Sequence, residues 1–161
     1  MLTIRPYAKA DEARALEICV AAFRPVHQGF REQLGEAVFR LQYHDWEDGY
    51  ARIFAAIAED DPVTEVFVGE ADGRIVGFVF ASLDAERKTG EIGLNAVDPD
   101  CQGRGYGKAL YAFALAHLKG RGAEIGYVAT GLDAAHAPAR AAYEAMGFDR
   151  RLPTVHYFRE L

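Results

Sequence analysis

The sequence contains few cysteines, no long apolar run and no excess of basic residues. Its two cysteines, Cys19 and Cys101, form neither a CxxC pair nor a Cys/His cluster, so their spacing predicts no metal site and no redox pair. Disulfides persist mainly in oxidising compartments, so we expect reduced thiols and a cytoplasmic protein. Cys101 has no acid or histidine motif beside it, which argues against an acyl-cysteine route.

The missing features also exclude two classes of partner. No apolar run reaches the roughly 20 residues that a membrane-spanning helix needs, and the first 13 residues lack a basic-then-apolar signal pattern. The formal charge of −6 argues against a basic stripe that would bind nucleic acid. We therefore expect no membrane partner and no nucleic-acid partner.

The 161 residues, half of them apolar, are expected to form one domain, 1–161, with a sizeable core. Alternation predicts a strand at 2–6, and apolar spacings of three and four predict a helix from 11 to about 25. An apolar, aromatic-rich stripe at 39–57 predicts a broken helix or two helices. Its aromatic residues either pack on the core or form a wall for a substrate.

Three antiparallel strands are predicted next, at 66–69, 75–82 and 91–97, because Asp-Gly at 72–73 is a strong hairpin-turn pair. Further helices and strands are expected toward the C-terminus. These are a helix around 110–118, a parallel strand at 125–129, a helix that begins near Pro138 and ends at Gly147, and closing strand character at 148 and 155–158.

A glycine-rich loop, Gln-Gly-Arg-Gly-Tyr-Gly at 102–107, joins the third of these strands to the following helix. Backbone N–H groups at a helix start are unpaired and lie at the positive end of its dipole, and glycines let the backbone approach a phosphate closely. The loop therefore predicts a pyrophosphate site. A P-loop is excluded because Ala109 follows Lys108 where a hydroxyl is required, and the G-x-G-x-G spacing departs from the dinucleotide fingerprint.

The order of the elements and two motifs resemble the GNAT N-acetyltransferase superfamily over nearly the whole chain. Residues 102–107 match its Gln/Arg-x-x-Gly-x-Gly/Ala motif, and Ala139, Tyr143, Gly147 and Phe148 match a second motif, in which His136 replaces the usual Asn. The resemblance implies an α/β (α+β) fold, with a mixed, mostly antiparallel sheet of about six to seven strands flanked by helices. It also implies that the sheet is splayed at an acetyl-CoA site.

Acetyl-CoA is the cosubstrate that the resemblance implies, with no metal. In the family, the segment matching 95–97 pairs with the pantetheine arm and the N–H groups of the segment matching 103–108 hold the pyrophosphate. The cations in that loop either contact the phosphates or remain solvated. The cofactor-binding candidates are therefore Asn95, Ala96, Val97, Gln102, Gly103, Arg104, Gly105, Tyr106, Gly107, Lys108 and His136, the last of which alternatively only caps its helix.

Acetyl transfer to an amine needs a base for the ammonium and an acid for the departing thiolate. Tyr143 is the candidate acid, because a phenol with a pKa near 10 stays protonated at neutral pH, although a core tyrosine is the alternative. Glu91 is the candidate base by its match to the histone-acetylating branch. It shares a face with Asn95 and Val97 if no bulge intervenes, and a solvated carboxylate or a water chain is the alternative. The Val97 N–H is the candidate donor to the tetrahedral intermediate.

The implied reaction is direct acetyl transfer, in a ternary complex, to a primary amine of a small molecule or peptide. The acidic and aromatic segment 42–48 suggests a cationic acceptor, and His156 and Tyr157 are candidates for the pocket edge. A homodimer is possible, since dimers are common in the family. The alternative is a non-catalytic CoA-binding or sensor module on the same fold.

Overall fold

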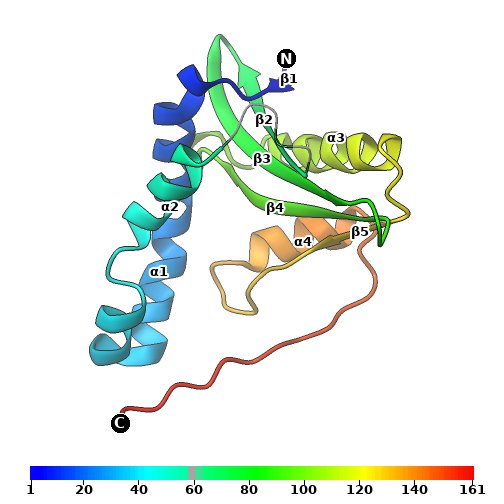
Figure 1. Ribbon diagram of the computed structural model, residues 1–161. Coiled ribbons are helices and arrows are strands. Elements are labelled where there is room, and N and C mark those ends of the chain that lie inside the picture. The colour runs from blue at the N-terminus through cyan, green and yellow to red at the C-terminus, as the bar shows by residue number, and fades with distance from the viewer. Residues whose placement is uncertain (58–60, 62) are drawn as a thin grey trace.

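The computed structural model describes residues 1–57, 61 and 63–161, in which a five-stranded sheet forms the middle layer (Figure 1). The strands lie in the order β1-β2-β3-β4-β5, the first four are antiparallel neighbours and β5 runs parallel to β4. The mixed, mostly antiparallel sheet is thus confirmed, with five strands instead of six or seven. The strands are β1 (Thr3–Pro6), β2 (Thr64–Ala71), β3 (Arg74–Asp84), β4 (Thr89–Val97) and β5 (Ile125–Val128).

Helices cover both faces of the sheet (Figure 1). On one face, α1 (Glu12–Gln42) and α2 (Trp46–Ala55) pack over a core that includes Val68, while α3 (Tyr106–Gly120) and α4 (Ala137–Ala145) cover Phe67 on the other. Successive side chains of a strand point to opposite faces, so β2 contributes to both cores. Two short 3-10 helices, Lys9–Asp11 and Pro99–Cys101, precede α1 and follow β4.

The predicted β2–β3 hairpin is confirmed at its turn. Asp72 and Gly73 both have positive φ angles, of 52° and 77°, as the tightest hairpin turns require. The crossover from β4 through α3 to β5 is the parallel connection predicted from the sequence.

The first helix does not end near Pro25 as predicted but continues to Gln42, with a break at Gly35, where φ is 76° and ψ is 163°. Proline inside a helix costs about 3 kcal/mol, because it removes a hydrogen bond and crowds the preceding turn. Burial of Val26 and stacking of the His27 ring on Trp46 of α2, immediately after the proline, help to offset that cost. The apolar stripe at 39–57 forms two helical segments, as one of the two predictions had it. The predicted helix stop at 60–62 lies largely outside the described residues.

The predicted closing strand is wrong, since residues 149–161 form neither helix nor strand. Figure 1 shows this segment leaving α4 and extending away from the sheet. Val155 and Tyr157 are 71% and 92% exposed, so they have strand-type side chains without a neighbouring strand. His156 and Tyr157 therefore do not reach the pocket edge. Within the described part of the chain, no helix is both long and apolar enough to cross a membrane.

Candidate active site

The sheet is splayed between β4 and β5. These strands pair only from Thr89 to Ile92, opposite Ile125 to Val128, and β4 then continues for five residues to Val97 beyond the last pair. The backbone of 93–97 therefore borders an open gap on its β5 side. Such a gap exposes peptide groups that an extended ligand can pair with, as an added strand would.

The register of β3 and β4 decides which peptide groups face this gap. Gly77 lies opposite Val97, and the N–H of Asp98 donates to the Val76 carbonyl at 2.9 Å. In an antiparallel ladder this makes Gly77–Val97 a pair without mutual hydrogen bonds, so the N–H and C=O of Val97 point away from β3. The side chain of Gln102 donates to that carbonyl at 3.3 Å. By alternation, the peptide groups of Asn95 and Val97, which were predicted to pair with the cofactor, face the gap, whereas the peptide groups of Ala96 face β3.

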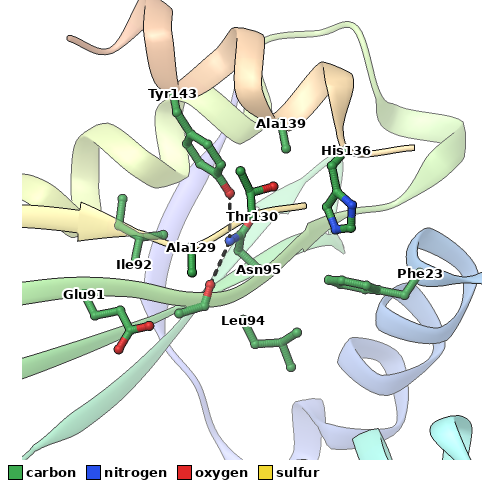
Figure 2. A pocket seen from close by; sticks show the side chains of 11 residues that line it. Phe23, Glu91, Ile92, Leu94, Asn95, Ala129, Thr130, His136, Ala139 and Tyr143 are labelled. Carbon is green, nitrogen blue, oxygen red and sulfur yellow. Dashed lines mark hydrogen bonds between the residues drawn. The ribbon is translucent and has the colours of Figure 1, made fainter. Parts of the chain in front are cut away.

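A bulge in β4 overturns one prediction about Glu91. Ala81 pairs with Ile92 but Val79 pairs with Asn95, so β4 has one extra residue over this stretch. The extra residue reverses which face of the sheet the odd-numbered side chains of β4 point to. Glu91 therefore does not share a face with Asn95; Figure 2 shows it below the strand and Tyr143 above. The Tyr127 hydroxyl, opposite on β5, donates to the Glu91 carboxylate at 3.0 Å.

A pocket of about 310 Å³ lies where β4 separates from the end of β5. Three of its walls come from β4, from the loop after β5 and from α4, and Phe23 of α1 closes it on the fourth side (Figure 2). It is lined by both predicted catalytic residues, Tyr143 and Glu91, and by two of the predicted cofactor-binding residues, Asn95 and His136. The lining residues are Phe23, Glu91, Ile92, Gly93, Leu94, Asn95, Ala129, Thr130, His136, Ala139 and Tyr143.

The Tyr143 hydroxyl is oriented by the Asn95 amide (Figure 2). The amide nitrogen donates to the Gly93 carbonyl at 2.8 Å and to the Tyr143 oxygen at 3.3 Å, and the amide oxygen accepts from the Tyr111 hydroxyl at 2.8 Å. Because an amide nitrogen only donates, the Tyr143 oxygen accepts and its own proton remains available. Tyr143 is buried, with 6% exposed, and burial raises the pKa of Tyr111, helped by the neighbouring Tyr143.

His136 is held by a residue that the sequence analysis did not single out. Its Nδ1 lies 2.6 Å from Asp133 Oδ2, and its backbone N–H donates to Asp133 Oδ1 at 3.2 Å. Burial opposes ionisation of Asp133, but the hydrogen bond and charge of His136 outweigh it and lower the pKa of the carboxyl. An Asp three residues before a His, in a loop that leads into a helix, is the sequence signal that marks such a pair.

The glycine-rich loop has the geometry expected of an anion cradle. Gly103 and Gly105 have φ angles of 76° and 82°, and a Cβ added at either would meet nothing within 4 Å, so the backbone is open to a ligand. Helix α3 begins directly afterwards, at Tyr106. The predicted cations of this loop, Arg104 and Lys108, are exposed. These residues therefore fit the pyrophosphate of a CoA-type ligand.

The loop is anchored by a buried carboxylate. Asp98, 8% exposed, forms an ion pair with Arg14 of α1 and accepts the backbone N–H of Asp100 at 3.0 Å. The end of β4 is thereby tied to the opposite face of the sheet, which fixes where the glycine-rich segment starts.

The aromatic residues of α1 and α2 mostly pack on one another. His27 is stacked on Trp46 with ring centroids 4.2 Å apart, and its Nε2 lies 3.3 Å from the Tyr50 hydroxyl. Burial lowers the pKa of His27 to about 4, and the nearby charge of His136 acts in the same direction. Among these aromatic side chains, Phe23 lines the pocket. Phe23 comes before the stripe at 39–57, which the sequence analysis had considered as a possible wall for a substrate.

Residues 14–148 match the sequence profile of the Acetyltransferase (GNAT) family. This match covers most of the chain, so the protein belongs to the GNAT family of acetyltransferases. Its fold and the family assignment thus agree with the resemblance that the sequence motifs indicated.

Curated relatives carry the name mycothiol acetyltransferase. The protein from Streptomyces coelicolor is 39% identical over 82 residues, which are 51% of this chain and 26% of that protein. The one from Kytococcus sedentarius is 29% identical over 157 residues, 97% of this chain and 48% of that protein. The chain thus spans between a quarter and a half of these relatives.

Solved structures show the same fold at low sequence identity. The PaiA N-acetyltransferase of Thermoplasma acidophilum, in complex with coenzyme A, has a TM-score of 0.70 at 17% identity, covering 92% of this chain and 90% of that one. The aminoglycoside N-acetyltransferase AAC(6')-Iy, in complex with CoA, has a TM-score of 0.70 at 17% identity, covering 100% and 96%. At this identity, the likeness concerns the fold alone.

Proposed function

We propose that this chain transfers the acetyl group of acetyl-CoA directly to a primary amine in a ternary complex. The observation that carries the proposal is the orientation of Tyr143, whose oxygen accepts from Asn95 while its proton stays available beside the β4–β5 gap. A phenol in that state is suited to protonating a departing thiolate. Family membership supports the same reaction.

The donor would occupy the gap and the glycine-rich loop. The N–H and C=O groups of Asn95 and Val97 that face the gap can pair with the amide groups of the pantetheine arm. The N–H groups of 103–108, at the start of α3, can receive the pyrophosphate, with Arg104 and Lys108 adding positive charge. Acetyl-CoA itself supplies the thioester.

Three groups beside the gap divide the chemistry in this proposal. Tyr143 is the acid, and the gap-facing N–H of Val97 is the donor to the oxygen of the tetrahedral intermediate. Glu91 lines the same pocket and remains a candidate for the base, although it lies across the bulge and accepts the Tyr127 hydroxyl.

A small molecule, or the end of a peptide, is the acceptor that suits a pocket of about 310 Å³. Relatives named for mycothiol and structural neighbours named for aminoglycosides support an amine-bearing small molecule in particular. Glu91 is the pocket's acidic side chain and would favour a cationic acceptor.

Release of free CoA thiol, measured with acetyl-CoA and a panel of amines, tests this function. Tyr143→Phe should lower kcat by about 10²- to 10⁴-fold, the usual contribution of a general acid, while leaving the affinity for CoA unchanged. Tyr157→Phe, at a side chain that is 92% exposed, is the matched control and should keep full turnover. Full turnover in Tyr143→Phe would remove Tyr143 from the acid role, and CoA binding without thiol release from any amine would favour the sensor alternative.

A further inference from the structure

We propose that His136, held by Asp133, is the general base that takes the proton of the acceptor ammonium. This inference rests on the acetyl transfer proposed above and assigns the base within the same pocket. It gives His136 a role other than cofactor binding or helix capping.

The hydrogen bond to Asp133 decides which ring nitrogen of His136 is the base. The Asp133 carboxyl is ionised at neutral pH, because its pKa is lowered, and an ionised carboxylate only accepts. Nδ1, 2.6 Å from Oδ2, must therefore carry the hydrogen. In the neutral ring, Nε2 then holds a lone pair, and this nitrogen has no hydrogen-bond partner among the described side chains. Orientation of an imidazole by a carboxylate in this way is what a general base requires.

The loop around this pair is built to hold it. The guanidinium of Arg140 donates to the carbonyls of Gly131 and Asp133 at 2.7 Å and 2.8 Å, which fixes the loop against α4. A Cβ at Gly131 would lie 2.3 Å from Asp133 Oδ2 and 2.6 Å from His136 Nδ1. Only glycine leaves room for this contact. The side chains of His136 and Asp133 are 17% and 10% exposed, so the pair is shielded from bulk water.

The pair faces the pocket that holds the proposed acid. His136, Ala139 and Tyr143 are spaced by three and four residues, so they line one face of α4. The separation of seven positions between His136 and Tyr143 corresponds to about 10 Å along the helix axis, and the small Ala139 leaves open space between them. Figure 2 shows the His136 ring pointing from the start of α4 toward Phe23. An acceptor between these two residues would have the base and the acid at opposite ends.

The environment favours His136 over Glu91. Glu91 lies on the other side of β4 and already accepts the Tyr127 hydroxyl, whereas the His136 ring lines the pocket and its Nε2 has no hydrogen-bond partner among the described side chains. The charged or titratable groups around the ring or in the same pocket include Asp133 on its own loop, Arg140 and Tyr143 on α4, His27 on α1 and Glu91 on β4. Since the pKa of His27 is lowered to about 4, His27 is neutral at pH 7 and does not repel a protonated His136.

The proton movements balance with these two side chains. The ammonium gives one proton to Nε2 of His136, and the neutral amine attacks the carbonyl carbon of the thioester to form the C–N bond. The C–S bond then breaks and the sulfur takes the Tyr143 proton. The remaining extra proton on nitrogen returns to the Tyr143 oxygen as the amide forms, and His136 releases its proton to water. Net, an ammonium and acetyl-CoA give an amide, CoA thiol and one proton.

Replacement of the ring tests the assignment. With spermidine, glucosamine, tobramycin and an alanyl dipeptide as probe amines, His136→Gln should lower kcat/KM by about 10²- to 10⁴-fold and abolish the acid limb of its pH profile. The affinity for CoA should stay within about twofold. In His136→Ala, added imidazole should restore turnover. His156→Gln, at an exposed histidine that does not reach the pocket, is the matched control and should behave as wild type.

Asp133 acts through the ring and is therefore a positioning residue. Asp133→Asn should lower kcat with little change in KM, and ring nitrogen NMR should show the Nδ1–H tautomer of His136 in wild type and a mixture in the variant. An Nε2–H tautomer in wild type would overturn the proposal, as would unchanged kcat/KM in His136→Gln. A large loss in Glu91→Gln with none in His136→Gln would make Glu91 the base. If wild type acetylates none of the probes, acetyl transfer itself fails, and this assignment with it.

Discussion

The substitution Asn95→Asp reverses the hydrogen bond that leaves the Tyr143 proton available. In the wild type the amide nitrogen of Asn95 donates to the Tyr143 oxygen at 3.3 Å. The introduced carboxylate is of nearly equal size but accepts only, so the Tyr143 hydroxyl turns to donate to it. The proton that should reach the CoA sulfur is then engaged elsewhere.

The expected size of this effect follows from the strength of one such bond. A hydrogen bond to a charged group contributes about 1.5–3 kcal/mol, and it must be broken before Tyr143 protonates sulfur. That barrier corresponds to a kcat lower by roughly 10- to 160-fold. The affinity for CoA should change little, since the peptide groups of Asn95, not its side chain, face the gap.

Steady-state thiol release measures kcat for this variant, and Tyr111→Phe is its control. That change removes the bond from the Tyr111 hydroxyl to the Asn95 oxygen, 2.8 Å long, but keeps the ring that packs against Tyr143 with centroids 5.0 Å apart. It should cost about 1 kcal/mol of stability, or about 2–4 °C in Tm, and leave kcat within about threefold. A wild-type kcat in Asn95→Asp would refute the reasoning that the amide sets the direction of the Tyr143 hydroxyl.

Two further outcomes follow from the loop and from the aromatic cluster. Gly105→Glu places a carboxylate in the anion cradle, at a φ of 82°, and should weaken acetyl-CoA binding at least tenfold, or about 1.4 kcal/mol, as measured by calorimetry. Gly120→Glu, at the far end of α3, is the control and should leave the affinity unchanged. Retained affinity in Gly105→Glu would refute the pyrophosphate assignment. The pKa of His27 is lowered to about 4 by burial and by His136, so the folded protein favours the neutral ring. The contribution of this neutral ring to stability is complete above about pH 6.5, and up to about 3 kcal/mol of it is lost as the pH falls toward 4. His27→Gln should therefore flatten the loss of Tm between pH 6.5 and 4, and an unchanged slope would mean that the folded protein accommodates a charged ring.

The glycine-rich loop and its flanking elements could be predicted from the sequence because their signals are local. The apolar strand before 98, the glycines at 103–107 and the apolar helix after them follow one another along the chain, and each is set by neighbouring residues. The Asp-Gly hairpin turn is local in the same sense. The second motif likewise singled out Tyr143, which lines the pocket.

Features that depend on distant partners could not be predicted in this way. The β4 bulge exists only relative to β3, so nothing within 91–97 signals that Glu91 and Asn95 face opposite sides. From the sequence alone, Pro25 predicts the end of a helix. The helix continues because the residues after it, including His27, are buried against other parts of the fold, which the sequence does not show. The residues at 155–158 have strand propensity, but a strand needs a partner, and none pairs with them in the described structure.

The bulge in β4 also explains why α4 can carry both side chains that we propose to move protons. One extra residue in the strand turns the Asn95 side chain toward α4, where it orients Tyr143, and leaves Glu91 on the opposite face, where it accepts the Tyr127 hydroxyl. The strand then contributes backbone groups to the gap and one orienting amide. Because His136 and Tyr143 lie on one helix face, their separation is fixed by the helix itself and does not depend on how the two faces of the sheet move relative to each other. A base on Glu91 would instead depend on the alignment of β4 with β5, which pair over only four residues.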